Sequence, residues 1–319
     1  MVATFSPAEL ALVALLEWLS TENYRFTTPT PMTHQRMWSR RQGETAENLR
    51  DIFGWNLPFT NSALPLPILS LLKQAGVLQT MKNQHRSAIR VSSIGERLFL
   101  HSAFPTEAEN AVFFGPDTYR FVNFIRQQLS QSEAKTDLRI LDVGCGSGAG
   151  GLMAAQFSPQ ATLTLSDINP IALRYSAINA HCALHPTTLV LSDVMAETPK
   201  NFDLIISNPP YLHDDFARLY RHGGEGLGRA LSVRIATEAL SHLPVDGRLL
   251  LYTGVAIIDG CDYFLNEMKT LLADDADYEW SYEEIDPDVF GEELERPIYH
   301  KAERIAAVGL SVRKCRPYY

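Results

Sequence analysis

The stretch LRILDVGCGSGAGG, residues 138–151, decides the fold of this chain. Its first six residues are mostly apolar and predict a short buried strand, and its glycine-rich half predicts a tight turn into a helix. Glycines let the backbone approach a ligand with no side chain in the way. The helix that follows begins with a partial positive charge, which favours a ligand carboxylate or phosphate. The spacing G-x-G-x-G after an acidic residue differs from the G-x-G-x-x-G dinucleotide fingerprint.

Acidic residues stand at the ends of three successive predicted strands. Asp142 ends the first strand, while strands 161–166 and 187–191 lead to Asp167 and Asp193. Because the carboxyl ends of parallel strands meet at one edge of an open sheet, we expect these carboxylates to line a common ligand site. One such Asp is more often a turn residue or a helix cap, so the prediction depends on the shared register. Asp142 suits a ligand ammonium, Asp167 both hydroxyls of a ribose, and Asp193 an adenine amino group.

The segment from 120 to 272 alternates strand-like and helical runs, which indicates an α/β fold with parallel strands and crossover helices on both faces. The predicted elements are strands 138–143, 161–166, 187–191, 202–207 and 247–253, and helices 149–157, 170–182, 229–242 and 260–272. Strands near 278–282 and 306–312 are expected to form an antiparallel pair at the far edge of the sheet.

The residues Asn208-Pro209-Pro210-Tyr211 follow a predicted buried strand and suit one chemical task, which is to hold a planar NH2 group for attack on an electrophile. The nitrogen of such a group is a poor nucleophile while its lone pair is conjugated. The Asn208 side-chain carbonyl and the Pro209 backbone carbonyl are two acceptors, since proline keeps its acceptor and loses its donor. Tyr211 provides a flat face for stacking. In isolation the motif also fits a stiff turn with a surface tyrosine.

Together these motifs resemble those of class I S-adenosylmethionine-dependent methyltransferases, and within them the enzymes whose Asn-Pro-Pro-Tyr motif acts on adenine, guanine or glutamine nitrogens. Two further segments are similar to the HemK/PrmC-type protein-glutamine methyltransferases. Pro116-Asp117-Thr118 resembles their Pro-Asp-Thr-Glu, with Tyr119 where Glu is usual. Gly223-Gly224-Glu225-Gly226-Leu227 resembles their Gly-Gly-x-Asp-Gly-Leu, with one residue missing and Glu for Asp. The resemblance covers residues 113–272 and does not extend to residues 1–105 or 274–303.

The resemblance implies a Rossmann-like, mostly parallel sheet with an antiparallel last strand, and S-adenosyl-L-methionine as the cofactor. The predicted cofactor-binding residues are Asp142, Gly144, Cys145, Gly146, Gly148, Asp167, Ile168, Asp193, Val194 and Asn208. The predicted catalytic residues are Asn208, Pro209, Pro210 and Tyr211. Tyr211, Arg218, Arg221 and Glu225 are predicted to bind substrate, because the connection 208–228 is long for a loop without a function. In-line methyl transfer depends mainly on positioning, so we expect no metal and no dedicated general base.

The 319 residues are enough for two domains, predicted at 1–105 and 106–319. In the first, a helix over 66–78, a hairpin over 79–91 and a short helix over 93–100 resemble a winged-helix unit in a smaller, mostly helical domain. Residues 1–105 hold 10 Lys and Arg against 7 Asp and Glu, a net charge of +3 in a chain whose total is -9. One interpretation is phosphate binding by Arg36, Arg40, Arg41, Lys82, Arg86 and Arg90. The other, which we favour, is a solvated basic face on a module that packs over the active site.

The stretch 274–295 carries 11 acidic residues and no basic one. If this stretch faced the acceptor site, it would repel nucleic acid. We interpret it instead as a solvated loop. The four cysteines lack C-x-x-C spacing, which indicates a reducing cytoplasm and no metal site. No apolar run reaches the roughly 18 residues of a membrane span, so no membrane partner is expected.

The function that fits these motifs best is N-methylation of a planar NH2 group in a macromolecule. The segments at 116–118 and 223–227 favour a protein glutamine amide, as in release factors, whereas the basic N-terminal region favours an adenine or guanine amine in RNA or DNA. A non-catalytic adenosylmethionine-binding module would have no need of an NH2 clamp. A nicotinamide dehydrogenase would require a catalytic His or Tyr-Lys set, which the sequence does not suggest.

Overall fold

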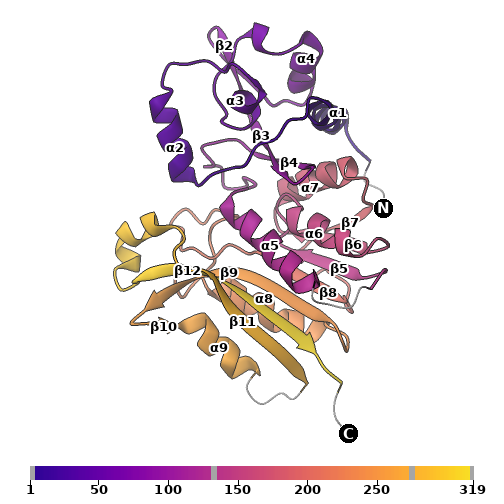
Figure 1. The fold of residues 1–319 in the computed structure, drawn as a ribbon, viewed down its shortest axis with the longest axis vertical. Coiled ribbons are helices and arrows are strands. Elements are labelled where there is room, and N and C mark those ends of the chain that lie inside the picture. Colours follow the sequence, from indigo (N-terminus) through magenta and orange to yellow (C-terminus); the bar gives the residue numbers. More distant parts are fainter. Residues whose placement is uncertain (1–3, 131–134, 273–276, 317–319) are drawn as a thin grey trace.

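The computed structural model describes residues 4–130, 135–272 and 277–316. It has an N-terminal part and a larger part built around one sheet, and helix α7 (Pro170–Cys182) lies between the two (Figure 1). None of the helices within the described ranges is long and apolar enough to cross a membrane.

The N-terminal part combines helices with two small antiparallel sheets. Its helices are α1 (Pro7–Thr21), α2 (Pro31–Arg40), α3 (Leu49–Phe53), the 3-10 turn η1 (Asn61–Ala63) and α4 (Leu66–Gln74). Its strands are β1 (Leu78–Met81), β2 (Gln84–Ser87), β3 (Ile89–Ile94) and β4 (Arg97–Ser102). Ser6 begins α1 with a capping box, because its hydroxyl accepts from the Glu9 backbone and the Glu9 carboxylate accepts from the Ser6 backbone.

Two details of the predicted N-terminal pattern are wrong. The hairpin partner of β1 is β2, at residues 84–87, and the predicted strand 88–91 belongs to a second hairpin, β3 with β4. The predicted helix 93–100 is the turn and second strand of that hairpin, because Gly95 takes a positive φ of 57° and the apolar residues after it are buried in extended backbone. The winged-helix assignment and the domain boundary at 105 stay predictions.

The larger part confirms the predicted sheet. Its strands are β5 (Arg139–Val143), β6 (Thr162–Asp167), β7 (Thr187–Leu191), β8 (Leu204–Ser207), β9 (Arg248–Ile258), β10 (Cys261–Asp262), β11 (Tyr278–Asp286) and β12 (Arg304–Lys314). The order is β11-β12-β9-β8-β5-β6-β7, with short β10 paired to β9. Strands β5 to β9 run parallel, whereas β12 runs antiparallel to both β9 and β11. The reversal of the last strand is the one that we predicted.

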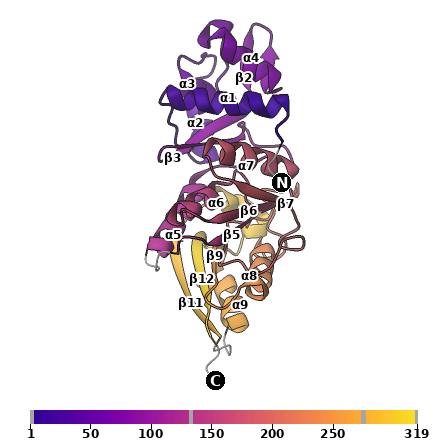
Figure 2. The ribbon, with the colours of Figure 1, turned by 90° about the vertical axis from the view of Figure 1, so that its right-hand side faces the viewer.

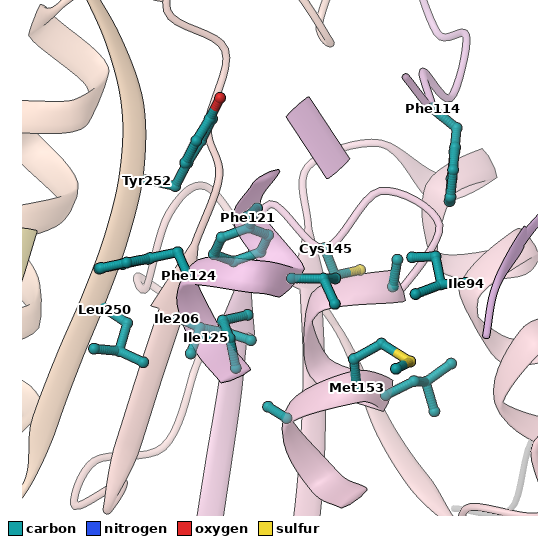
Figure 3. Close-up of a cluster of buried hydrophobic side chains, with 14 of the residues drawn as sticks. Ile94, Phe114, Phe121, Phe124, Ile125, Cys145, Met153, Ile206, Leu250 and Tyr252 are labelled. Carbon is teal, nitrogen blue, oxygen red and sulfur yellow. The ribbon is translucent and has the colours of Figure 1, made fainter. Parts of the chain in front are cut away.

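Helices cover both faces of this sheet, and Figure 2 shows α5 and α6 on one side and α8 and α9 on the other. The helices are α5 (Pro116–Ser130), α6 (Ala149–Ala154), α7, α8 (Ala230–His242) and α9 (Tyr263–Leu272), with 3-10 turns η2 (Ala155–Phe157), η3 (Gly291–Glu295) and η4 (Pro297–Tyr299). In Figure 3, Phe121, Phe124 and Ile125 of α5 gather beside Ile206 and Leu250 of the sheet, and all five are buried. This packing holds the start of α5 at the sheet edge where ligands bind.

Helix α7 joins the two parts. Its Ile178 is fully buried in the core of the N-terminal part, while Leu173 and Ala180 pack in the core of the sheet. The Asn179 side chain accepts a hydrogen bond from Leu100 N (2.8 Å) and donates one to Ser147 O (2.8 Å). A strand of the N-terminal part and the glycine-rich loop are therefore held by the same amide group.

The N-terminal core predicts a clear contrast between two leucines of α4. Leu72 is fully buried and Leu66 is 76% exposed. We expect Leu72→Ala to lower the free energy of unfolding by about 2–5 kcal/mol through lost burial and a cavity. Leu66→Ala should change it by less than about 0.5 kcal/mol. Urea denaturation measures both, and equal losses would contradict this description of the core.

Candidate active site

A cavity of about 340 Å³ opens at the carboxyl edge of the sheet. Its walls come from the segments that follow β5, β6, β7 and β8, from residues of α8, and from the chain over 111–121 that leads into α5. Phe290, near the C-terminal end of the sequence, completes them. The predicted site residues that line it are Asp142, Gly144, Cys145, Gly146, Asp167, Ile168, Asp193, Val194, Asn208, Pro209, Pro210, Tyr211, Arg218 and Arg221. Gly148 and Glu225 are not among the lining residues. The roles of all these residues stay predictions, but the structure brings most of them together.

The glycine-rich loop takes a backbone path that only glycine follows without strain. Gly144, Gly146 and Gly148 all have positive φ, at 67°, 53° and 76°. Gly148 does not face the cavity, and a Cβ there would lie 3.0 Å from the Cβ of Ser176. Gly150 packs so closely that a Cβ would lie 2.4 Å from the Phe121 ring. The glycines thus serve close packing against α5 and α7 as well as access for a ligand.

Two carboxyl groups lie beside this loop, that of the buried Asp142 and that of the half-buried Asp167. Asp142 Oδ2 accepts a hydrogen bond from Gly151 N at 2.7 Å, and burial, with Asp167 nearby, raises the pKa of Asp142 to about 7. The Asp167 oxygens accept from Gly146 N (2.9 Å) and Asn169 N (2.8 Å), and burial raises the pKa of Asp167 as well. A cationic group placed beside Asp142 would stabilise its anion, so this site is suited to a ligand ammonium.

The third predicted carboxylate, Asp193, has a different environment. It is exposed at the rim of the cavity, and both its oxygens accept from Arg234 Nη1 of α8, at 2.9 and 3.1 Å. The neighbouring Val194 is buried. Ile168, which follows the adjacent strand β6, is 51% exposed. The rim therefore offers apolar surface and one ion-paired carboxylate, which is a suitable environment for a planar heterocycle.

The turn Asn208–Tyr211 is held from below by Asp117, the second residue of α5. The Tyr211 hydroxyl donates to Asp117 Oδ2, and the Tyr252 hydroxyl donates to Asp117 Oδ1 at 2.8 Å. Burial raises the pKa of Asp117, and Arg120 contributes a third contact at 3.1 Å. The Tyr211 ring is consequently immobilised with 7% of its surface exposed. It borders the cavity as a fixed wall.

Asn208 itself is free to bind a guest. It is half-buried and faces the cavity, and within the described part of the chain no group hydrogen-bonds with its side-chain amide. Ser207 just before it is fully buried and donates to Val143 O at 2.8 Å, which fixes the end of β8 against β5. The strand end is thus rigid while the amide that follows keeps its hydrogen-bonding capacity.

The glycines of residues 223–228 pack closely against the backbone of the same turn. A Cβ on Gly223 would lie 2.7 Å from Pro210 O, and one on Gly228 would lie 2.2 Å from Tyr211 O. Gly223 N also donates to Leu212 O at 2.8 Å. Only residues without side chains allow the connection to fold back this closely, so this segment supports the backbone of the turn.

The predicted substrate arginines line the cavity but are already paired. Arg218 Nε donates to Asp214 Oδ2 at 3.0 Å. Burial alone would raise the pKa of Asp214, but the hydrogen bonds from Arg218 outweigh it and lower that pKa to about 2. Arg221 pairs with Glu293. Glu225 is exposed and away from the cavity. The two arginines therefore hold the long connection in shape.

Comparison with known proteins agrees with this geometry. Residues 122–254 match the family model of the methyltransferase small domain. They form an S-adenosylmethionine-dependent methyltransferase domain. The predicted enzyme class and its cofactor are confirmed.

Relatives of this domain have names that give different acceptors. A release factor glutamine methyltransferase of Lactococcus lactis is 33% identical over 150 residues, which are 44% of this chain and 54% of that protein. A ribosomal RNA small subunit methyltransferase C of Serratia proteamaculans is 33% identical over 111 residues, which are 35% of this chain and 29% of that protein. The chain thus spans about half the length of the first relative and less than a third of the second.

A solved structure shares the fold. The crystal structure of Trm5b from Pyrococcus abyssi superposes with a TM-score of 0.50 at 14% identity, covering 78% of this chain and 67% of that one.

Sequence reasoning missed several residues of the candidate site. Asp117 lies in a motif that we quoted without giving it a role, and only the fold shows that it holds Tyr211. Phe290 lines the cavity although it lies in the acidic stretch 274–295. The interpretation of that stretch as a solvated loop is wrong for the part that carries Phe290 and Glu293, because Glu293 is buried and neutralised by arginines, among them Arg296 at 2.7 Å. Residues 274–276 of the stretch lie outside the described residues.

Gly254 of β9 provides a steric test of the Tyr211 position. A Cβ at Gly254 would lie 2.2 Å from the Tyr211 ring, so Gly254→Ala must displace that ring. We expect methyl transfer to fall about a hundredfold, as for a misplacement of about 1 Å, with little change in cofactor affinity. Transfer from labelled cofactor to a cell extract measures the first, and calorimetry the second.

The matched control is Gly247→Ala just before β9, where a Cβ would lie 2.7 Å from Pro244 Cδ, at the end of the strand away from the cavity. It should lower stability and leave turnover per folded molecule unchanged. Equal effects of both substitutions on turnover would show that the Tyr211 position is unimportant.

The raised pKa of Asp142 predicts a pH dependence of cofactor binding. Below pH 7 its carboxyl is protonated, so binding an ammonium must release that proton, whereas above pH 7 the anion is already present. The affinity for S-adenosylhomocysteine should therefore rise up to about tenfold per pH unit as the pH approaches 7 from below, and then level off. Calorimetry in buffers of different ionisation enthalpy measures affinity and proton release together.

Adenosine is the control ligand, because it has the ribose but no ammonium. Any pH dependence of adenosine affinity reports on Asp167. The additional pH dependence that S-adenosylhomocysteine shows is assigned to Asp142. An identical pH profile for both ligands would contradict the assignment of Asp142 to the ammonium.

Proposed function

We propose that this protein transfers a methyl group from S-adenosylmethionine to a planar NH2 group of a macromolecule. The observation that carries the proposal is the Asn208 amide, which faces the cavity at the end of a rigid strand and has no partner among the described residues. An asparagine with unused hydrogen-bonding capacity next to two proline carbonyls is what an NH2 clamp requires. A module that only binds the cofactor has no need of it.

The cofactor is assigned to the part of the cavity below the glycine-rich loop. Asp142 would pair with its ammonium, and Asp167 would accept from the ribose hydroxyls. The apolar Ile168 and Val194 at the rim would contact the adenine, near Asp193. These assignments follow from the burial and partners of each side chain, and the pH experiment on Asp142 tests the first of them.

Positioning provides most of the catalysis in this proposal. The acceptor nitrogen forms a bond to the methyl carbon as the carbon–sulfur bond breaks, and the bonding electrons stay on sulfur, which becomes a neutral thioether. The Asn208 and Pro209 carbonyls hold the two N–H groups so that the nitrogen lone pair points at the methyl carbon. They also stabilise the positive charge that develops on nitrogen. The surplus proton then leaves to water.

The acceptor class is the open part of this proposal. The segments 116–118 and 223–227 favoured a glutamine amide by their resemblance to release-factor enzymes. In the structure Asp117 and Gly223 support the Asn208–Tyr211 turn itself, through the Tyr211 hydroxyl and the Pro210 backbone. A clamp for any planar NH2 group needs that support, so these segments do not distinguish a glutamine amide from a base amine.

Substitution of Asn208 tests the proposed function. We expect Asn208→Ala to lower methyl transfer to a cell extract at least about a hundredfold, as when one preorganised polar group is removed from an active site. Binding of S-adenosylhomocysteine should stay within a few-fold of the wild type, because other residues hold the cofactor. The control is Asn266→Ala on the exposed surface of α9. Parallel losses of binding and turnover at Asn208 would refute the clamp.

A further inference from the structure

A second cavity, of about 480 Å³, lies between the N-terminal part and the methyltransferase domain. It is lined by α2, by Arg90 of β3 and by the chain around Phe104, and on the other side by Glu292 and Glu293. Phe113, Arg218, Tyr220 and Arg221 line both this cavity and the active-site cavity. The two cavities therefore share part of their walls.

Arg90 is a buried cation that has no anionic partner in this cavity. It is 2% exposed, and no carboxylate of the described residues lies within ion-pair distance of its guanidinium. Its Nε donates to Ser102 O at 3.2 Å, and its Nη1 lies 3.3 Å from His34 Nδ1. Burial lowers the pKa of Arg90 to about 10, so the group stays charged at neutral pH. A buried charge without a counterion is unfavourable, and an anionic ligand would relieve that cost.

The histidines beside Arg90 do not neutralise it. His34 Nε2 lies 2.9 Å from Trp55 O and must donate to that carbonyl, so Nδ1 is left as an acceptor for Arg90. Burial and the Arg90 charge lower the pKa of His34 to about 3. His101 is fully buried, and its pKa is also lowered by burial. Both rings are thus neutral at pH 7, and the positive charge remains on the arginine.

The rest of the cavity wall is positive on balance. Arg36 of α2 is exposed and forms no ion pair within the described residues. Glu293 is compensated by Arg221 and Arg296, and Arg218 is paired with Asp214 outside the cavity wall. Glu292 is the remaining acidic group. Arg36 and Arg90 together therefore outweigh it, and the guanidinium group is the side chain best suited to bidentate phosphate binding.

Two aromatic rings belong to the wall that the cavities share. The Phe113 and Tyr220 rings are parallel within 11°, with centroids 5.9 Å apart. The Tyr220 hydroxyl donates to Thr106 O at 2.5 Å, which anchors this shared wall to the chain that leads from the N-terminal part. Flat apolar surfaces next to guanidinium groups are typical of sites that bind unpaired bases and their phosphates.

We propose that the second cavity binds a backbone phosphate of single-stranded nucleic acid, and that the adjoining base places its amine at Asn208. This inference rests on the proposed function and names its acceptor class. Each nucleoside in a strand is linked to backbone phosphates, so a base bound in the first cavity would bring an anion close to the second cavity. A glutamine in a polypeptide has no obligatory anion beside it. The target base must be unpaired or flipped out of a duplex to reach Asn208.

The test compares arginines of the same helix. Arg36 lines the second cavity, whereas Arg40, four residues later on α2, is exposed but does not. A fluorescein-labelled single-stranded RNA of ten nucleotides is titrated in the presence of S-adenosylhomocysteine at several salt concentrations. Arg36→Gln should weaken binding severalfold and reduce the slope of log affinity against log salt by about 0.7, which corresponds to one phosphate contact. Arg40→Gln should leave both unchanged.

Arg90 is tested by a pair of variants because its burial puts folding at risk. Arg90→Lys keeps the charge and Arg90→Met removes it, and thermal melting with S-adenosylhomocysteine binding shows whether each remains folded. We expect Arg90→Met to weaken RNA binding about tenfold, the cost of one lost charged hydrogen bond, and Arg90→Lys to weaken it less. Equal RNA affinities for wild type, Arg36→Gln and a folded Arg90→Met would overturn the inference.

Labelled methyl transfer separates this inference from the proposed function. Cell extract is incubated with enzyme and labelled S-adenosylmethionine, and RNA, DNA and protein are counted separately. Label in RNA or DNA that falls with Arg36→Gln supports the inference. Label in protein that Arg36→Gln does not change overturns it while the proposed function stands. Transfer that survives Asn208→Ala in every fraction overturns the proposed function, whatever the RNA affinities.

Discussion

The buried carboxyl group of Asp117 is the contact on which the Asn208–Tyr211 turn depends. It accepts the hydroxyls of Tyr211 and Tyr252 and is close to Arg120, so a group at the start of α5 fixes both the turn after β8 and the middle of β9. Removing such a carboxyl group would leave two buried hydroxyls unsatisfied. The position of Asn208 thus depends on the packing of α5 against the sheet, where Phe121 and Phe124 are buried.

A second dependence runs through α7. Asn179 binds the backbone of Leu100 on one side and Ser147 on the other, so the N-terminal part and the glycine-rich loop share one hydrogen-bonded amide. Ile178 adds an apolar contact to the same junction. The N-terminal part therefore cannot move relative to the glycine-rich loop without breaking buried contacts. This rigidity gives the cavity with Arg90 a defined position next to the active site.

The elements of the sheet were predictable because they are long and regular. Strands β5, β6 and β7 begin and end within about one residue of the predicted ranges, since apolar runs bounded by glycine, proline and aspartate leave few alternatives. The N-terminal hairpins were less predictable. Residues 97–102 contain an apolar run that fits a helix as well as a buried strand, and its pairing with residues 89–94 decides between them.

The order of residues along the chain was enough to identify the glycine-rich loop, the acidic strand ends and the Asn-Pro-Pro-Tyr turn, because each is a local pattern in which neighbouring residues do the chemistry. Tertiary structure alone decided which charges are compensated. Glu293 belongs to an acidic run in the sequence, yet Arg221, 72 positions away, neutralises it. Arg90 belongs to a basic region in the sequence, yet it is buried without a counterion. Charge pairing and burial depend on distances across the fold, and a linear pattern contains no information about those distances.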